Sequence, residues 1–303
     1  MTQEVTSFKA VKIPDTYGCA TRFLYNTVPG RIVLKLLIKT SVSQLAGLLL
    51  RCPASRVLIK RFVKQNNINM EEYREVKFKS FNDFFIREIK EEYRPLPQSG
   101  LYLAAPSDGK LTAYQISADS VYDIKHSKYS IENMLQDKEL ADEYSDGVCL
   151  IFRLTPDDYH RYIYIDDGDV LLQKRINGVL HTVRPIAFEH YDVFGQNTRD
   201  YTIIQTKNFG KVVQIEVGAL FVGRISNHNK NRVIKRGEEK GMFEFGGSTI
   251  VMLFQKDKIT VDKVIYENTD LNMETLVKMG NKIGTCHQSS SSSSSESETG
   301  TTS

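Results

Sequence analysis

Residues 245–254 read FGGSTIVMLF, an apolar run that begins directly after two glycines, a serine and a threonine. A short apolar run next to glycines is typical of a buried β-strand, which we expect over residues 250–254. The glycines at 246 and 247 permit backbone angles that are closed to other residues, so this turn can orient the Ser248 hydroxyl. The stretch therefore predicts a buried strand that is opened by a serine.

Similar short runs, separated by Gly, Asp and Asn turns, begin near residue 101 and continue to this strand. Strict alternation of apolar residues is clear at Val213, Ile215 and Val217. Residues 1–80 differ, because their apolar residues recur at helical spacing. We therefore expect an α+β fold in which a helical N-terminal region, 1–80, precedes a β-rich domain of short antiparallel strands, 81–284. Residues 285–303 are serine-rich and predict a disordered tail.

Composition excludes several classes of protein. The 303 residues are 41% hydrophobic and 25% charged, which is typical of a globular chain. A net charge of +3 is too small for a general nucleic-acid binder. The four cysteines lie far apart with no C-x-x-C pair, which argues against a disulfide scaffold or a cysteine zinc site and favours a reducing, cytosolic setting. No metal requirement is indicated.

The most apolar stretch of the chain, residues 31–51, reads RIVLKLLIKTSVSQLAGLLLR. In a helix, Lys35, Lys39 and Ser43 share one face, while most of the leucines lie on others. This pattern fits a helix that lies in a membrane interface, with nearby basic residues meeting anionic head groups. We then expect a peripheral or monotopic attachment to the cytoplasmic face of the membrane. A core helix whose lysines reach solvent explains the pattern equally well. A membrane-spanning helix is a poorer fit, because charges interrupt the run.

Candidates for chemistry lie at turns between the expected strands: Asp108 in APSDG, His160 in TPDDYHR, and Ser248 in GGST. Each alone has an ordinary explanation as a turn or core residue. Together they suggest a nucleophile, a base and a group that orients the base. A serine hydrolase fits poorly, since its G-x-S-x-G elbow needs glycine where Ile250 stands. The remaining possibility is that Ser248 attacks the carbonyl of Gly247, in the chain's own backbone.

At this point the motifs resemble those of a known family, the phosphatidylserine decarboxylases. The resemblance covers roughly residues 80–284, in the order typical of the family, and the helical lead-in resembles the family's membrane-associated region. The motifs are R-P-L (94–96), P-S-D-G-K (106–110), D-Y-H-R (158–161), V-G-A-x-x-V-G-R-I (217–225) and K-R-G-E-E-K-G-x-F-x-F-G-G-S-T (235–249).

The resemblance implies an inactive proenzyme that cuts itself between Gly247 and Ser248. The products would be a β chain, 1–247, and an α chain, 248–303, in which Ser248 has become a pyruvoyl group. This covalent cofactor would form a Schiff base with phosphatidylserine and decarboxylate it to phosphatidylethanolamine, a carboxy-lyase reaction. The implied partners are a phospholipid substrate, a membrane surface and the two cleaved chains, and the resemblance leaves open a homodimer of the cleaved pair.

The resemblance also assigns roles to single residues. Asp108 matches an aspartate that assists self-cleavage by orienting a histidine, and His160 matches a histidine implicated in decarboxylation. Many members read Y-H-R-x-H, with a second histidine for processing, but here Ile163 stands in that place. Self-cleavage would then use His160 for both tasks, use His181 or His228, or proceed slowly. A second departure is Val183-Arg184-Pro185, where the family has V-N-P.

Two other functions stay open. A pyruvoyl-dependent decarboxylase of another amino acid or amine lipid would share these motifs. A pseudoenzyme that never cuts itself and only binds membranes would share the fold, and Ile163 is the feature that favours it.

Overall fold

The computed structural model describes residues 8–13, 17–124, 127–220, 224–228, 232–246 and 248–287. At its centre lies a nine-stranded sheet in which every neighbouring pair is antiparallel. In spatial order the strands are β1 (Lys9–Lys12), β16 (Met273–Val277), β3 (Gly109–Gln115), β6 (Val148–Leu154), β14 (Ser248–Phe254), β10 (Lys211–Gly218), β9 (Arg199–Thr206), β8 (Gly168–Ile176) and β12 (Val233–Ile234). The predicted α+β class is confirmed.

Strand β14 lies in the middle of this sheet and is buried along its whole length. Its alternate residues face two different core clusters: Ile250 and Met252 belong to one, and Val251 and Leu253 to the other. Because both faces are covered, the strand reads as a continuous apolar run, which is why it was visible in the sequence. The predicted strand is confirmed, and it begins two residues earlier, at Ser248.

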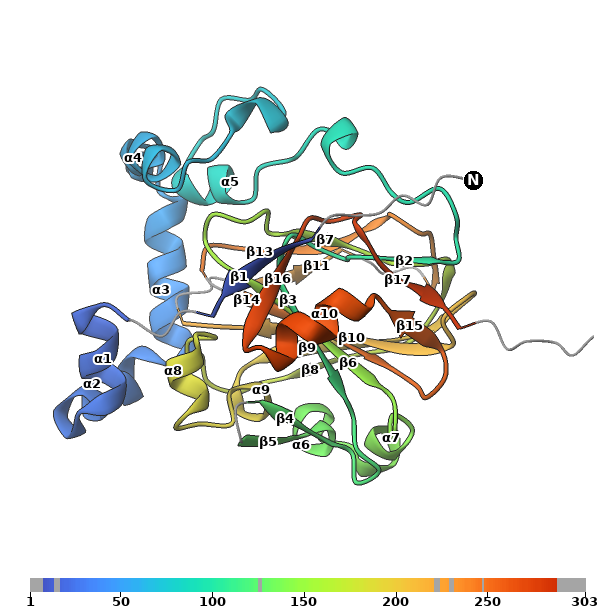
Figure 1. Ribbon diagram of the computed structural model, residues 1–303. Helices are drawn as coiled ribbons and strands as arrows, with labels where there is room; N and C mark the ends of the chain where they lie inside the picture. The colour runs from blue at the N-terminus through green and yellow to red at the C-terminus, as the bar shows by residue number, and fades with distance from the viewer. Residues whose placement is uncertain are drawn as a thin grey trace, which may run out of the picture.

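Smaller sheets and short helices cover the main sheet (Figure 1). Helix α10 (Lys263–Asp270) packs against β3 and β16. The small sheets are β11 (Ile225–Asn227), β13 (Glu239–Phe243) and β7 (Arg161–Ile163); β15 (Ile259–Val261), β17 (Lys282–Cys286) and β2 (Tyr102–Ala104); and β4 (Val121–Ile124) with β5 (Ser127–Ser130). The helices are α6 (Ile131–Leu135), α7 (Lys138–Asp142), α8 (Pro185–Phe188), α9 (Val193–Gln196) and α10 (Lys263–Asp270). Because β17 includes residues 285 and 286, the expected tail begins later than residue 285. Residues 288–303 lie outside the described part of the chain.

The N-terminal region is mainly helical, and α1, α2 and α3 lie along one side of the sheet (Figure 1). One expectation for this region is wrong, because Lys9–Lys12 forms strand β1, which pairs with β16 at the edge of the main sheet. Four residues are too few for helical and strand periods to be told apart in the sequence. The elements are α1 (Cys19–Asn26), α2 (Val28–Leu37), α3 (Thr40–Arg51), η1 (Pro53–Arg56), α4 (Val57–Gln65), η2 (Met70–Glu72), α5 (Phe81–Phe85) and η3 (Glu91–Tyr93).

The stretch 31–51 is not one helix. Helices α2 and α3 meet at Ile38 and Lys39 with a bend of 65°, and Lys39 has extended backbone angles. Among the described residues no single helix has the length and apolarity of a membrane span, whereas the bent pair taken together does. Many apolar side chains of this region face solvent: Phe23, Val28, Ile32, Val33, Leu36, Leu45, Leu48, Leu49, Val57 and Leu58.

Candidate active site

Ser248 is the first residue of β14, and the sheet holds it from both sides. Its Cα partners are Leu154 on β6 and Gly218 on β10, and its side chain is fully buried. The turn before it uses the freedom of glycine, since Gly246 has φ +136°, a region that side chains rarely adopt. Gly247, the other half of the expected cleavage junction, lies outside the described residues, so the orientation of its carbonyl is not described.

His160 lies against Ser248. Its Nδ1 is 3.4 Å from Ser248 Oγ, and its Nε2 is 3.1 Å from the carbonyl oxygen of Thr155. A carbonyl oxygen only accepts hydrogen bonds, so Nε2 carries the ring proton and Nδ1 presents a lone pair to the serine hydroxyl. The ring of Phe85 packs on the imidazole, with centroids 4.2 Å apart, and fixes its plane. The pair therefore has the arrangement of a nucleophile and its base.

Burial keeps His160 neutral. Loss of hydration and, second to it, the positive charge of Arg87 together lower its pKa to about 3. Arg87 is itself buried, and its guanidinium lies 4.3 Å from the centre of the Tyr73 ring. At neutral pH the histidine is therefore free to accept a proton from Ser248.

Asp108 has other partners. Its carboxylate accepts two hydrogen bonds from the Arg94 guanidinium, at 2.8 and 2.7 Å, and a third from the Met279 backbone N–H at 2.8 Å. Arg94 also donates to Glu72 at 3.1 Å. The structure therefore pairs Asp108 with an arginine, not with the histidine that the resemblance implied. The sequence offered one signal for this pairing, since Arg94 belongs to the R-P-L motif.

The histidines considered as substitutes for a second base lie elsewhere. His228 is exposed and lies 2.7 Å from a carboxylate oxygen of Glu239. His181 is buried, with a pKa lowered to about 4 by burial, and it stacks on Tyr191 with ring centroids 4.1 Å apart. Ile163 is a buried residue of β7. Within the described part of the chain, His160 is the histidine that contacts Ser248.

A pocket of about 260 Å³ opens beside the serine. Leu154 and Ala219 line it, which places it at the Ser248 end of β14, and Gly246 of the junction lines it as well. Its other lining residues come from α1, from β6 and the turn after it, from the segment before α8, and from the segments after β10 and before β14: Thr21, Leu24, Tyr25, Arg153, Thr155, Pro156, Thr182, Val183, Arg184, Leu220 and Phe245. None of these described lining residues is acidic.

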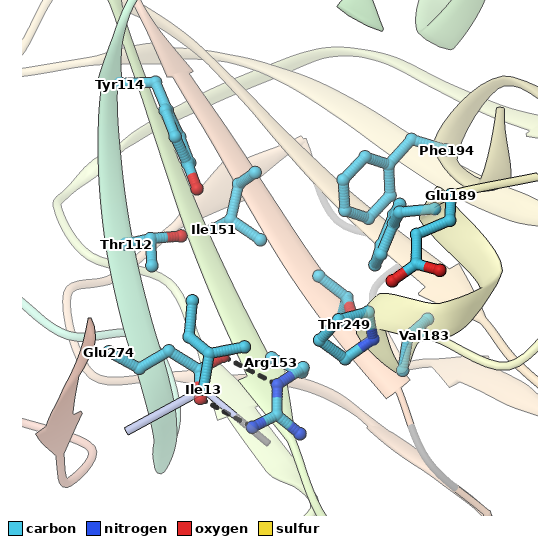
Figure 2. Close-up of a pocket in the computed structure, with 12 residues that line it drawn as sticks. Ile13, Thr112, Tyr114, Ile151, Arg153, Val183, Glu189, Phe194, Thr249 and Glu274 are labelled. Carbon is cyan, nitrogen blue, oxygen red and sulfur yellow. Dashed lines mark hydrogen bonds and ion pairs between the residues drawn. The ribbon is translucent and has the colours of Figure 1, made fainter. Parts of the chain in front are cut away.

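A smaller cavity of about 70 Å³ lies on the other side of Arg153. Arg153 and Val183 line both spaces. Figure 2 shows Arg153 bound to Glu274 by two hydrogen bonds, which measure 2.7 and 2.6 Å, below an apolar wall that includes Ile151 and Phe194. The Arg153 charge is therefore already neutralised by an acidic partner within the fold.

Among the residues that the structure describes, no group of three or more His, Cys, Asp or Glu side chains is placed to hold a metal ion.

The fold and the site define an α+β enzyme in which a buried serine meets a neutral histidine at the start of the central strand. The family model for phosphatidylserine decarboxylase matches residues 81–285. The chain is 47% identical to phosphatidylserine decarboxylase proenzyme 2 of Clostridium acetobutylicum, over 87% of this chain and 90% of the relative. Identity is 41% to the proenzyme of Clostridium novyi, over 87% and 92%, and 39% to that of Fusobacterium nucleatum, over 88% and 90%. The chain belongs to the phosphatidylserine decarboxylase family and is a carboxy-lyase.

Proposed function

We propose that the chain cuts itself between Gly247 and Ser248, turns Ser248 into a pyruvoyl group, and with it converts phosphatidylserine into phosphatidylethanolamine. The observation that carries this proposal is the contact of Ser248 Oγ with the unprotonated Nδ1 of His160. The family supports it as well, because the relatives of Clostridium and Fusobacterium are named proenzymes.

Self-cleavage needs a base beside the serine hydroxyl, and His160 is in contact with it. His160 Nδ1 takes the proton of Ser248 Oγ, which attacks the Gly247 carbonyl carbon. The amide nitrogen of Ser248 takes a proton as the C–N bond breaks, and an ester links the two residues. Loss of the Ser248 α-proton then expels the Gly247 carboxylate and leaves dehydroalanine. Water adds to dehydroalanine and ammonia leaves, so the atoms balance.

The residues around position 248 fit the group that this sequence of steps makes. The pyruvoyl group supplies an electrophilic carbonyl that acts as a sink for the electrons released with CO₂. It would need no binding residues of its own, since it would be part of the chain at the first position of β14, where Ser248 now lies between Leu154 and Gly218. His160, which contacts Ser248 and is neutral, would be the residue that holds or delivers a proton there.

The substrate class agrees with the exposed apolar surface of α1, α2 and α3. Ile32 on α2 and Leu48 and Leu49 on α3 are each more than 60% exposed. Apolar side chains beside basic ones favour attachment to an anionic membrane surface. Helix α1 also supplies Tyr25 to the wall of the 260 Å³ pocket, so a lipid that enters from the membrane reaches the site along this helix. We therefore infer peripheral attachment to the cytoplasmic face of the membrane. A homodimer of the cleaved pair stays a prediction from the resemblance.

The test is the mass of the purified protein. Cleavage at this junction yields fragments of about 27–28 and 6–7 kDa, at about 110 Da per residue, in place of the intact 34.6 kDa chain. The small fragment should be lighter than its serine-ended form by the mass of one ammonia. Ser248→Ala should abolish cleavage and CO₂ release together. Release of CO₂ from phosphatidylserine by a chain that is still intact would refute the proposal.

A further inference from the structure

The pocket beside Ser248 carries one cationic side chain that the mechanism does not use. Two arginines line this pocket, and Arg153 is bound to Glu274 on the far side. Arg184 is exposed, and within the described part of the chain its guanidinium has no ion pair. Because no described lining residue is acidic, the pocket presents a net positive charge. Such a pocket favours an anionic ligand.

The backbone that carries Arg184 is held firmly. The N–H of Leu180 donates to the Ile38 carbonyl at 2.9 Å, and the N–H of His181 donates to Asn197 Oδ1 at 2.9 Å. The N–H of Thr182 donates to Tyr25 Oη at 3.0 Å. Arg184 therefore follows directly after a backbone segment that is anchored to neighbouring elements.

Tyr25 adds a neutral donor to the same pocket. Its hydroxyl oxygen accepts the Thr182 N–H, so its own proton remains available to a second acceptor. Burial raises the pKa of Tyr25 to about 12, which keeps the proton in place at neutral pH. A charged fork and a hydroxyl on one pocket wall suit a phosphate oxygen or a carboxylate.

The chemistry of the reaction decides between these two anions. The serine carboxylate loses its charge as CO₂ leaves, so an arginine bound to it stabilises the substrate more than the transition state and slows the reaction. The phosphodiester keeps its charge from substrate to product. An arginine bound to the phosphodiester therefore tightens binding without opposing the chemical step.

We propose that Arg184 binds the phosphodiester of the substrate head group in the pocket beside Ser248. This inference rests on the proposed decarboxylation of a serine phospholipid. It also gives a role to a departure from the family pattern, since Arg184 stands where V-N-P has asparagine.

Kinetics with a short-chain, water-soluble phosphatidylserine test the assignment without a membrane. Rates are expressed per cleaved chain, so that slower maturation does not distort them. Arg184→Ala should raise KM about 10-fold or more, the range typical of a lost hydrogen bond to a charged group, and leave kcat within about twofold. The KM of Arg184→Lys should lie between that of the unmodified enzyme and that of Arg184→Ala. Arg232→Ala, at an exposed arginine that does not line this pocket, is the control and should match the unmodified enzyme. An unchanged KM, or a loss confined to kcat, overturns the proposal.

A binding measurement separates this inference from the proposed function. Calorimetry on the uncut Ser248→Ala protein needs no turnover, with glycerophosphoserine, inorganic phosphate and free serine as the three ligands. Adding Arg184→Ala to this protein should weaken the binding of glycerophosphoserine about 10-fold and leave the affinity for free serine unchanged. Equal affinity for glycerophosphoserine with and without Arg184 refutes the site even if the enzyme is active. If the unmodified enzyme does not decarboxylate phosphatidylserine, the proposed function fails while this measurement still decides the role of Arg184. Inorganic phosphate that binds as tightly as glycerophosphoserine overturns the head-group assignment.

Discussion

At the scale of single residues, the imidazole of His160 connects Ser248 to the Thr155 carbonyl, and this geometry fixes which nitrogen is the base. Replacing it with glutamine keeps a polar side chain of similar length but removes the base. We expect His160→Gln to slow self-cleavage by about 10²–10⁴-fold, the range typical of a lost general base. A time course of fragment formation on denaturing gels measures this. His228→Gln removes an exposed histidine that is bound to Glu239 and serves as control. Equal slowing by both changes would show that His160 has no special role.

The pH dependence of cleavage follows from the lowered pKa of His160. The active form is the neutral imidazole, and with a pKa of about 3 this form dominates at every pH above about 4. The cleavage rate of freshly translated proenzyme, transferred into buffers between pH 5 and 8, should therefore be flat. An ordinary histidine with a pKa near 6.5 would instead lose most of its rate between pH 7 and 5. A midpoint near 6.5 would contradict the buried, neutral state.

Asp108 is expected to act on the fold rather than on the serine. Asp108→Asn leaves the buried Arg94 with one acidic partner fewer, at a cost of about 3 kcal/mol in the free energy of unfolding. Urea unfolding of the uncut Ser248→Ala protein measures this cost. The double variant, Arg94→Met with Asp108→Asn, removes the buried arginine charge as well. It should therefore recover part of the lost free energy of unfolding.

Self-cleavage in the same double variant, with Ser248 intact, separates the two roles of Asp108. Near-normal cleavage would show that the carboxylate acts only through its pairing with Arg94. Slow cleavage in a variant that has regained its stability would assign the carboxylate a direct part in processing.

At the scale of elements, the sequence predicted some parts much better than others. Strand β14 was predictable because burial on both faces makes it a continuous apolar run between clear turns. Strand β1 was not, because its four residues pair with β16, which lies more than 250 residues away. The break between α2 and α3 was also missed, because Ile38 and Lys39 are ordinary residues in a helix. The extended angles of Lys39 occur where the distant Leu180 N–H bonds the Ile38 carbonyl, a contact that no local pattern shows.

The exposed apolar surface of α3 leads to a prediction for this element. Leu48 is 63% exposed, and burial of such a side chain in a membrane interface contributes about 1.5–3 kcal/mol. Leu48→Glu should therefore weaken binding to phosphatidylserine vesicles about 10-fold or more in a flotation assay, while self-cleavage proceeds normally. Val233 on β12 is 62% exposed, so Val233→Glu is a matched control that should float as before. An equal loss of vesicle binding in both variants would mean that the added negative charge, and not the exposed surface of α3, governs attachment.

At the scale of the whole molecule, the site is assembled from segments that lie far apart in the chain. His160 and Ser248 are 88 residues apart, and Asp108 meets the Met279 backbone across 171. The sequence motifs named His160, Ser248 and Asp108 as candidates, and the structure brings His160 and Ser248 into contact, yet the motifs did not show that Asp108 faces Arg94. Pairings of this kind depend on the register of strands from distant parts of the chain, such as β3 against β6 and β16, and no local pattern encodes that register.

The same interleaving predicts how the cleaved molecule behaves. The fragment that begins at Ser248 contributes β14, which lies between β6 and β10, and β16, which lies between β1 and β3. Strands β14 and β16 are thus hydrogen-bonded on both sides to the larger fragment, and the small fragment cannot leave without dismantling the main sheet. The cleaved protein should elute from a sizing column at the volume of the uncut Ser248→Ala protein, and its fragments should separate only in denaturant. Escape of the small fragment in native buffer would show that cutting loosens the sheet, contrary to this topology.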